Sequence, residues 1–254
     1  MPRILAVANQ KGGVAKTTTV VNLGAALAEA GARVLVVDLD AQACATFSLG
    51  LDPEDLERTA ADAFLAPEGA ALHELIAPTP DGVDLLPASI GLAGADRALA
   101  SVVGREFIVR DVLAPVTDAY DWILLDCSPS LGIITINALT AADEVLIPLQ
   151  CETLSHRGVG QLMETIDDVR RLTNPRLRVA GVLPTLYDGR TVHARAVLDD
   201  LGPRYGVRVL APISRSIRFA EAPAAGRSIL ATAPTSRGAQ EYRRLAHQLA
   251  TPPV

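Results

Sequence analysis

The 254-residue sequence predicts a doubly wound α/β fold, in which helices cover both faces of a mainly parallel sheet. Two patterns lead to this prediction. Short apolar segments alternate along the chain with longer segments of helical periodicity, as in repeated βαβ units. Several apolar segments, such as VLVVD and WILLD, also lack the polar alternation of half-exposed strands, which is typical of central strands covered on both faces.

The expected elements follow from these patterns in chain order. Apolar runs bounded by turn residues predict strands at 4–8, 33–38, 83–86, 122–126, 144–149, 178–184 and 207–211. Helical patterns predict helices at 16–30, 105–114, 130–142, 156–172, 194–201 and 236–249. The segment 52–100 is richer in Pro, Gly, Ala and acidic residues, which indicates surface helices with one inserted strand. No linker separates these elements, so residues 1–254 are expected to form a single domain.

Composition excludes several classes of protein. With 49% hydrophobic residues and a net charge of −6, the chain is not disordered. Cys44, Cys127 and Cys151 are far apart and form no C-x-x-C pair, which argues against a disulfide framework or zinc site and favours a reducing compartment. Met1 leads directly into a strand-like segment, and the uncharged run 127–142 is too short and polar for a membrane span. We therefore expect a cytoplasmic protein.

Charge is distributed unevenly along the chain. Residues 1–150 carry 8 basic and 20 acidic side chains, whereas residues 151–254 carry 15 basic and 9 acidic ones. The negative charge of the whole chain argues against a histone-like coat on DNA. The basic C-terminal part predicts a local anion-binding face, and scattered solvated arginines are the alternative.

A glycine-rich loop contains the only two lysines of the chain, Lys11 and Lys16, whereas the other 21 basic residues are arginine. The loop lies between a predicted strand and a predicted helix, which is the order of a phosphate-binding loop. There, backbone N–H groups and the helix N-terminus face phosphates, a lysine reaches their oxygens and a hydroxyl binds Mg²⁺. The pattern G-x-x-x-x-G-K-[ST] is not met, because Gln10 and Ala15 occupy its two glycine positions. A glycine turn without function is the alternative.

Three acidic residues follow predicted strands: Asp38, Asp40 and Asp126. Ligands of open α/β sheets bind outside the carboxyl ends of the strands, where carboxylates can hold Mg²⁺ or orient water. Any one of them could instead cap a helix, but their number near a glycine loop favours a site.

The loop K-G-G-V-A-K-T at 11–17 resembles the deviant Walker A loop of the ParA/MinD family of P-loop ATPases. The segment VDLDAQ at 37–42 resembles the family's switch I, and DCSPS at 126–130 resembles its switch II. Segments 148–152, 186–191 and 218–223 are similar to those of the short ParA/Soj partition proteins. The resemblance covers nearly the whole chain.

The resemblance implies an ATP- and Mg²⁺-dependent enzyme with a defined set of site residues. Lys16 would contact the β- and γ-phosphates, Lys11 would cross a dimer interface to the partner's nucleotide, and Asp40 would orient the attacking water. Thr17 would bind Mg²⁺, supported by Asp38 and Asp126. Gly12 would allow a second subunit to approach, and adenine would lie near 212–216. The nucleotide would contact Lys11, Gly12, Gly13, Val14, Ala15, Lys16, Thr17 and Thr18.

The resemblance also implies a partition cycle. Two ATP molecules would be held between two chains, and this homodimer would bind double-stranded DNA nonspecifically through Arg190, Arg215 and Arg218, with hydrolysis stimulated by a ParB-like protein. Such a protein would be nucleoid-associated. The alternatives to DNA binding are that Arg190 caps a helix and that Arg215 contributes to the nucleotide pocket.

Some residues depart from the family pattern. Ala15 replaces a glycine, which a negative φ would tolerate. In switch I, Ala41, Ala43 and Cys44 stand where the family usually has Pro, Gly and Asn, and Ser128 replaces a proline in switch II. These departures bear on the hydrolysis rate more than on the fold.

Other functions share this loop. A MinD-like membrane-cycling ATPase would need an amphipathic anchor, whereas Tyr242, Leu245 and Leu249 of the last helix are expected to pack inward. An iron–sulfur reductase would need a cluster context that the cysteines lack. A GTPase is disfavoured because both lysines lie in the loop, leaving none for the guanine-reading motif N-K-x-D. A non-hydrolysing nucleotide-dependent scaffold stays open because of the switch departures.

Overall fold

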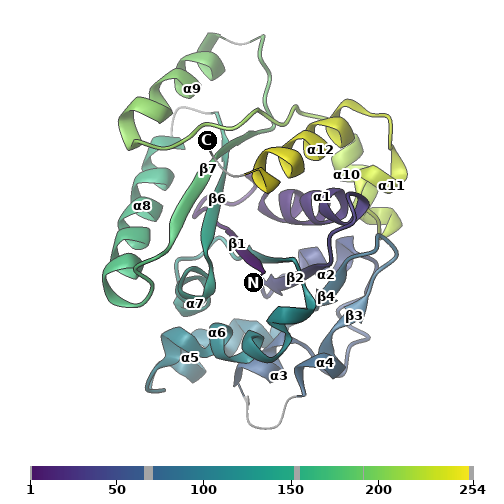
Figure 1. Cartoon of the computed structure of the whole chain (residues 1–254), viewed down its shortest axis with the longest axis vertical. Coiled ribbons are helices and arrows are strands. Elements are labelled where there is room, and N and C mark those ends of the chain that lie inside the picture. The colour runs from purple at the N-terminus through teal and green to yellow at the C-terminus, as the bar shows by residue number, and fades with distance from the viewer. Residues whose placement is uncertain (1, 66–70, 152–154, 191, 252–254) are drawn as a thin grey trace.

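The computed structural model describes residues 2–65, 71–151, 155–190 and 192–251. Seven strands form one sheet in the order β3-β4-β2-β5-β1-β6-β7, and every neighbouring pair is parallel except β3 with β4. This sheet confirms the predicted fold class (Figure 1). The strands are β1 (Arg3–Val7), β2 (Val34–Leu39), β3 (Ala77–Pro78), β4 (Asp84–Leu86), β5 (Trp122–Cys127), β6 (Glu144–Gln150) and β7 (Arg178–Thr185).

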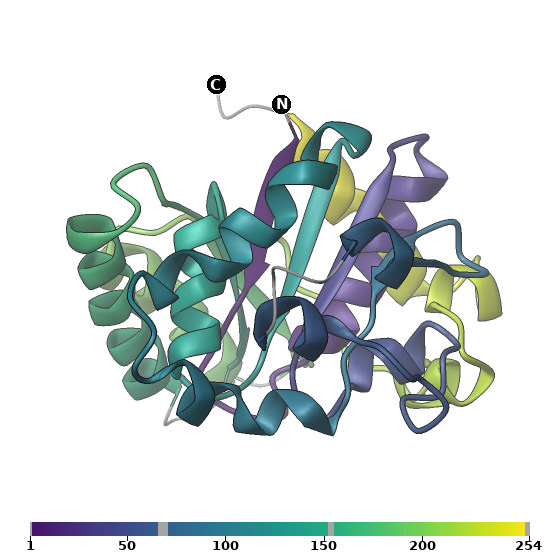
Figure 2. The same cartoon turned by 90° about the horizontal axis from the view of Figure 1, so that it is seen from below.

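Helices cover both faces of the sheet, as predicted. In Figures 1 and 2, α1 and α12 lie side by side on one face, whereas α7 and α8 lie on the other. The α-helices are α1 (Lys16–Glu29), α2 (Cys44–Ser48), α3 (Ala60–Leu65), α4 (Leu72–Leu75), α5 (Ala95–Leu99), α6 (Ile108–Leu113), α7 (Ile133–Ala141), α8 (Ser155–Leu172), α9 (Val192–Tyr205), α10 (Arg218–Glu221), α11 (Ile229–Thr232) and α12 (Arg237–Ala250). Short 3₁₀ segments are η2 (Ile90–Gly94), η3 (Arg105–Phe107), η4 (Ala114–Ala119) and η5 (Ala222–Ala225).

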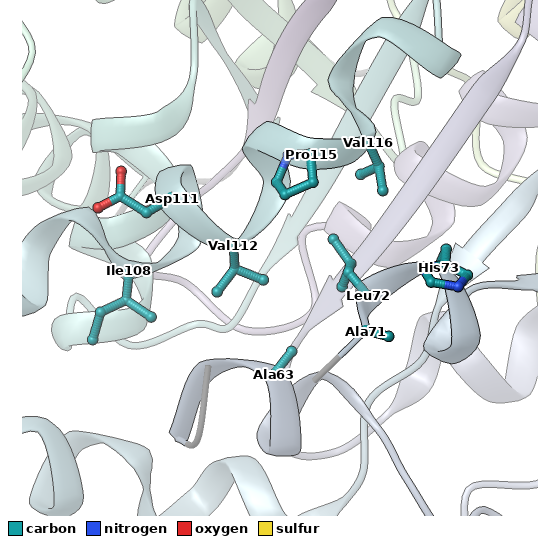
Figure 3. A pocket seen from close by; sticks show the side chains of 9 residues that line it. All are labelled: Ala63, Ala71, Leu72, His73, Ile108, Asp111, Val112, Pro115 and Val116. Atoms are coloured by element: carbon teal, nitrogen blue, oxygen red, sulfur yellow. The ribbon is translucent and has the colours of Figure 1, made fainter. Parts of the chain in front are cut away.

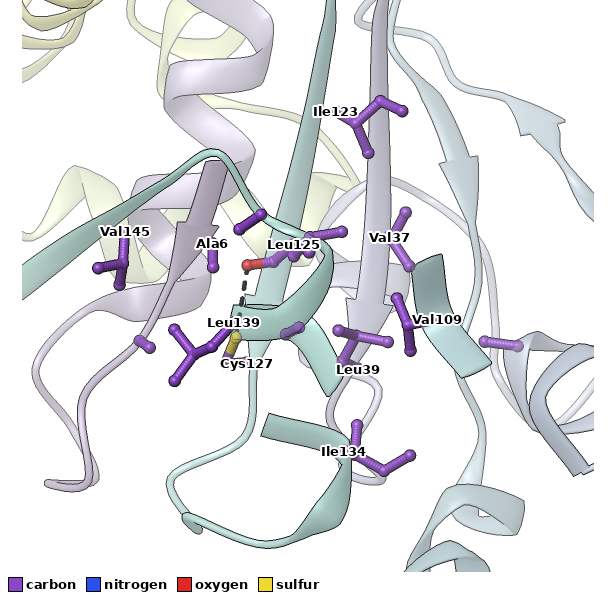
Figure 4. Close-up of a cluster of buried hydrophobic side chains, with 14 of the residues drawn as sticks. Ala6, Val37, Leu39, Val109, Ile123, Leu125, Cys127, Ile134, Leu139 and Val145 are labelled. Atoms are coloured by element: carbon purple, nitrogen blue, oxygen red, sulfur yellow. Dashed lines mark hydrogen bonds between the residues drawn. The ribbon is translucent and has the colours of Figure 1, made fainter. Parts of the chain in front are cut away.

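Alternate residues of the central strands build two separate apolar cores. Leu5 and Val7 of β1 pack with α1 and α12, whereas Ala6 belongs to the core on the other face. Figure 4 shows this second core, where Ala6 and Leu125 of the sheet lie near Leu139 of α7. Burial on both faces explains why these strands read as continuous apolar runs.

The last helix uses its apolar face internally. Tyr242, Leu245 and Leu249 of α12 are buried in the core that contains α1, which confirms that they pack inward. Throughout the described ranges, every helix is too short or too polar to cross a bilayer.

The predicted strand at 207–211 is wrong. This segment runs beside β7, where Val182 donates its N–H to the Arg208 carbonyl (2.8 Å) and accepts from Leu210 N–H (2.9 Å), but only one bridge forms, between Val182 and Val209. The next two ladder donors would be the backbone nitrogens of Pro184 and Pro212, which carry no hydrogen. Proline on both segments therefore interrupts the pairing.

The helix predicted at 105–114 is also divided. An uninterrupted helix would bond the Arg105 carbonyl to the N–H of Val109. Instead the buried amide of Asn137 lies between them, donating to the Arg105 carbonyl (2.6 Å) and accepting from Val109 N–H (3.0 Å). The segment therefore splits into the 3₁₀ turn η3 and the helix α6, followed by η4.

Candidate functional site

The site lies where the carboxyl ends of β1, β2 and β5 meet. Because β5 lies between β1 and β2, Asp126 is in register with both Val7 and Asp38. The chain leaves β1 through the glycine loop and enters α1 at Lys16. The topology therefore brings the loop and the strand-end carboxylates together at one edge of the sheet, as expected for an open α/β fold.

Two side chains outside the predicted set hold the glycine loop. The buried Asn9 donates from Nδ2 to the Pro148 carbonyl (2.7 Å), and its Oδ1 accepts from Lys11 N–H (3.0 Å). Thr185, at the end of β7, donates from Oγ1 to the Val14 carbonyl (2.9 Å). The loop is thus fixed to β6 and β7. The position of Asn9 directly before the loop could have indicated this role from the sequence. Nothing in the sequence around Thr185 could have done so.

Ala15 adopts a conformation that favours glycine. It is the N-cap of α1 with φ 63° and ψ 38°, so the negative φ that would tolerate alanine is not what the loop adopts. The left-handed region costs an alanine about 1 kcal/mol. Ala15 provides no side-chain cap, and so the first N–H groups of α1 receive no side-chain acceptor there.

Lys16 is directed back into the loop. Its side chain is buried and its ammonium donates to the Lys11 carbonyl (3.3 Å). Burial lowers the pKa of Lys16, and the negative charge of Asp126 opposes that shift. Lys11 is half-buried, and Gly12 is exposed, with open space where a Cβ would lie.

Thr17 and Asp126 form the pair of oxygens that the sequence predicted for magnesium. Thr17 Oγ1 donates to Asp126 Oδ2 (2.7 Å), while the other carboxylate oxygen, Oδ1, is buried and has no hydrogen-bond partner in the described part of the chain. Burial, followed by the charge of Asp38, raises the pKa of Asp126 well above its usual range. An orphaned carboxylate oxygen beside a hydroxyl is a donor set suited to Mg²⁺.

Asp38 is engaged by the protein itself. Its Oδ2 accepts from the N–H (2.9 Å) and the hydroxyl (2.8 Å) of Thr46, and its Oδ1 accepts from Asp40 N–H (3.1 Å). Burial raises the pKa of Asp38 to about 6, although the Thr46 bonds oppose the shift. Asp38 thus fixes the segment that leads into α2. Asp40 is half-buried on this segment and accepts from Gln42 N–H (3.0 Å).

A cavity of 1380 Å³ opens beside the glycine loop. Three non-glycine residues of the described chain have positive φ, Ala15, Ala43 and Leu186, and all three line it. Strained backbone of this kind gathers at functional sites. Its lining also includes Gly13, Thr17, Thr18, Ala41, Cys44 and Ser216, so it joins the glycine loop, the switch I segment and the end of the loop predicted for adenine.

A second, apolar cavity of 480 Å³ lies away from this chemistry. It is bounded by surface helices α3, α4, α6 and η4, and Leu72, Ile108 and Val112 point into it (Figure 3). Among the described residues that line it, His73 and Asp111 are the ionisable ones. No group of three or more His, Cys, Asp or Glu residues that could hold a metal occurs in the described ranges.

The arginines predicted to bind DNA lie on two surface segments. Arg190 and Arg215 line a common pocket, whereas Arg218 begins α10 three residues later. The Arg190 guanidinium donates twice to Asp188 (2.9 and 2.7 Å) and the Arg190 N–H once (3.1 Å), and these bonds lower the pKa of Asp188 to about 2. Arg218 pairs with Glu221 (2.9 Å). All three arginines are exposed. Two residues of the motifs used above, Glu152 and Thr191, lie outside the described residues.

Comparisons with known proteins identify relatives along nearly the whole chain. Residues 2–179 match a family model described as an AAA domain. The sporulation initiation inhibitor protein Soj of Bacillus subtilis is 43% identical over 98% of this chain and 99% of that protein. The chromosome-partitioning ATPase Soj of Thermus thermophilus is 45% identical over 97% of this chain and 95% of that protein.

A similar solved structure carries a different name. The structure named cobyrinic acid a,c-diamide synthase from Mycobacterium smegmatis, with bound ADP and magnesium, is 49% identical, with a TM-score of 0.87, and covers 97% of this chain and 93% of that one. A further structure under that name holds an ATP analogue and magnesium and has a TM-score of 0.88. Taken with the family model and the two Soj relatives, these matches show that the chain belongs to the Soj/ParA family of P-loop ATPases.

Proposed function

We propose that this protein is a DNA-partitioning ATPase whose ATP-bound homodimer binds double-stranded DNA nonspecifically, and whose hydrolysis to ADP, stimulated by a ParB-like partner, releases the DNA. The observation that carries the proposal is the pair formed by Thr17 and Asp126 at the N-terminus of α1, where Asp126 Oδ1 is buried and no described residue bonds to it. The names of the Soj relatives support the partitioning role.

Thr17 and Asp126 are the residues that would hold Mg²⁺, with Asp38 supporting them through the switch I segment. Mg²⁺, when bound, supplies neutralisation of the charge on the β- and γ-phosphates. Lys16 would transfer its hydrogen bond from the Lys11 carbonyl to the phosphate oxygens, which restores a counter-charge to a buried ammonium. The residues 11–18 would surround the phosphates with backbone N–H groups.

Asp40 would orient the attacking water from the switch I segment, directly before the cavity-lining Ala41. Its backbone is tied to Asp38, whose carboxylate is buried, so its position is set by the end of β2. Lys11 would act in the opposite subunit, where a second ammonium stabilises charge on the transferring phosphoryl group as an arginine finger does. The exposed Gly12, with open space around it, would permit that approach.

Arg190, Arg215 and Arg218 would contact DNA phosphates. Contacts of this type carry no sequence information and weaken steeply with salt. In the cell, such binding would associate the protein with the nucleoid.

The test is a DNA titration with ATP, with ADP and without nucleotide, at two salt concentrations, while mass is followed in parallel. Salt-sensitive binding restricted to ATP, together with a doubled mass, is the expected result. Lys11→Ala should retain nucleotide and lose hydrolysis, whereas Arg190→Ala combined with Arg218→Ala should lose DNA binding and retain nucleotide. Full hydrolysis by the first variant, or normal DNA binding by the second, would contradict the proposal.

Amide synthesis is a second candidate because of the name carried by the M. smegmatis structures. An amide synthase that takes ammonia from glutamine needs an activated thiolate, which in turn needs a lowered cysteine pKa. Burial raises the pKa of all three thiols here, those of Cys44, Cys127 and Cys151. These thiols do not favour that chemistry. Release of glutamate from glutamine in the presence of ATP would restore this candidate.

A further inference from the structure

A polar pocket of 480 Å³ brings together three arginines from three distant segments. We call it the arginine pocket, and its lining includes Tyr187, Asp188, Arg190, Ser214, Arg215 and Arg237. Arg190 and Arg215 belong to segments that the family resemblance singled out. Arg237, the first residue of α12, belongs to neither, and no motif in the sequence links it to them.

A buried carboxylate organises the pocket. Glu241, one turn after Arg237 on α12, has a side chain that is only 7% exposed. It accepts from Ser214 N–H (2.8 Å), from Ser214 Oγ (2.8 Å) and from Arg237 Nε (2.8 Å). One carboxylate therefore fixes both the Arg237 side chain and the backbone next to Arg215. The Arg237 side chain remains 78% exposed and can meet a ligand.

Two segments that line the arginine pocket also contribute neighbouring residues to the 1380 Å³ cavity beside the glycine loop. Tyr187 pairs with Ser214 as an isolated parallel bridge, with Tyr187 N–H donating to the Ile213 carbonyl (3.0 Å) and Arg215 N–H donating to the Tyr187 carbonyl (3.3 Å). The neighbours of this bridge, Leu186 and Ser216, line the large cavity, whereas Tyr187 and Ser214 line the arginine pocket. A shift of either segment would change both.

The chemistry of the lining selects an anion with several oxygens. Three guanidinium groups meet two carboxylates: Asp188, which pairs with Arg190, and Glu241, which pairs with Arg237. The geometry of a guanidinium group matches that of phosphate, so that one guanidinium can donate two parallel hydrogen bonds to two phosphate oxygens. The pocket carries a net positive charge, and its hydroxyl and backbone groups add no further negative charge.

We propose that Arg237 is a third arginine of one DNA-phosphate pocket, together with Arg190 and Arg215, and that Glu241 is a positioning residue that holds this pocket in shape. The proposal rests on the proposed function, because the phosphate belongs to the DNA that the ATP-bound protein binds. It adds a residue of α12 and a buried acid to the three arginines named above.

Arg237→Ala tests the contact, and Arg244→Ala is the matched control. Arg244 is exposed and lies two turns further along α12, so both variants remove the same charge from the same helix. At about 0.1 M salt, loss of one phosphate contact should weaken ATP-dependent DNA binding about five- to tenfold and reduce the slope of log K against log salt by about 1. Arg244→Ala should keep the DNA affinity within about twofold of the wild type and leave the salt slope unchanged.

Glu241→Gln separates positioning from overall charge. Removal of a negative charge strengthens DNA binding if only the net field matters. If Glu241 positions Arg237 and Ser214, the same variant weakens binding, because a neutral amide holds the guanidinium and two Ser214 donors less well. Thermal unfolding and ATP binding are measured for each variant. Arg237→Lys provides a milder test, which should retain the salt slope and lose affinity.

The outcomes are distinct. If the wild type fails to bind DNA with ATP, both the proposed function and this proposal are overturned. If the wild type binds DNA but Arg237→Ala and Arg244→Ala have the same DNA affinity and salt slope, only the assignment of Arg237 is overturned. Unchanged or tighter binding by Glu241→Gln overturns the positioning role alone.

Discussion

The hydroxyl of Thr19 in α1 lies 3.3 Å from the phenol oxygen of Tyr242 in α12 and donates at 2.7 Å to the carbonyl of Ala15. The Tyr242 ring in turn meets Phe219 edge to face, with ring centroids 5.7 Å apart. Because Thr19 bonds to Ala15 of the glycine loop and Phe219 follows Arg218, the buried Tyr242 connects the loop, through Thr19, to the segment that carries Arg218.

Tyr242→Phe should keep the ring packing and lose the hydroxyl contact with Thr19. We expect the free energy of unfolding to fall by about 1 kcal/mol, the usual net value of one hydrogen bond. Urea unfolding measures the change. A double-mutant cycle with Thr19→Val should give a coupling energy of similar size, and strict additivity would show that the two hydroxyls do not interact.

Ala15→Gly should stabilise the protein, although glycine is costly in the interior of a helix. The positive φ of Ala15 is free of strain for glycine, and after the extra entropy of the unfolded chain is subtracted we expect a gain of about 0.5 kcal/mol. Ala28→Gly, inside α1, is the control and should cost about 1 kcal/mol. A loss of stability in Ala15→Gly, measured by the same urea unfolding, would contradict the strain assigned to the loop.

Thr46→Val should destabilise the protein by about 2 kcal/mol because it leaves two buried groups short of a partner. The Thr46 hydroxyl donates to Asp38 (2.8 Å) and accepts from Ala88 N–H (2.9 Å). Thr46→Ser keeps the hydroxyl and should remain within about 1 kcal/mol of the wild type. Equal losses in the two variants would assign the effect to the methyl group and not to the hydrogen bonds.

Asp121→Asn should make the stability of the fold less dependent on pH in the acid range. Hydrogen bonds from Arg33 lower the pKa of Asp121 to about 2 from its ordinary 3.8. In the folded state the carboxylate is therefore favoured, and the stability it contributes is present above about pH 4 and is lost as the pH falls towards 2. Thermal midpoints between pH 2 and 5 measure this loss. Asp118→Asn is the control, and an identical pH dependence in Asp121→Asn and the wild type would contradict the assignment.

Sequence alone predicted those parts of the fold and site that depend on local pattern. The glycine loop with Thr17, the pair Asp38 and Asp40, and Asp126 each lie in a short segment directly after a strand, and the parallel topology brings these segments together. Ala15 shows the limit of prediction from local pattern. The sequence shows that residue 15 is alanine, but it does not show that its φ is positive.

The parts that could not be predicted depend on contacts between distant segments. Asn137 divides the helix at 105–114 from 28 to 32 residues away, and a proline on β7 helps to stop the strand at 207–211. Glu241 reaches Ser214 only because α12 packs on the sheet next to α1. Such residues carry no motif of their own.

The contact between Thr19 and Tyr242 also has a consequence for biosynthesis. The two residues are 223 positions apart, so α1 has long been translated before α12 is made and can reach it. Chains emerge from the ribosome N-terminus first, so the glycine loop receives this support only after α12 has followed. Nascent or truncated chains that lack α12 would therefore hold an incompletely braced loop, and we expect nucleotide capture to begin only after α12 has been translated.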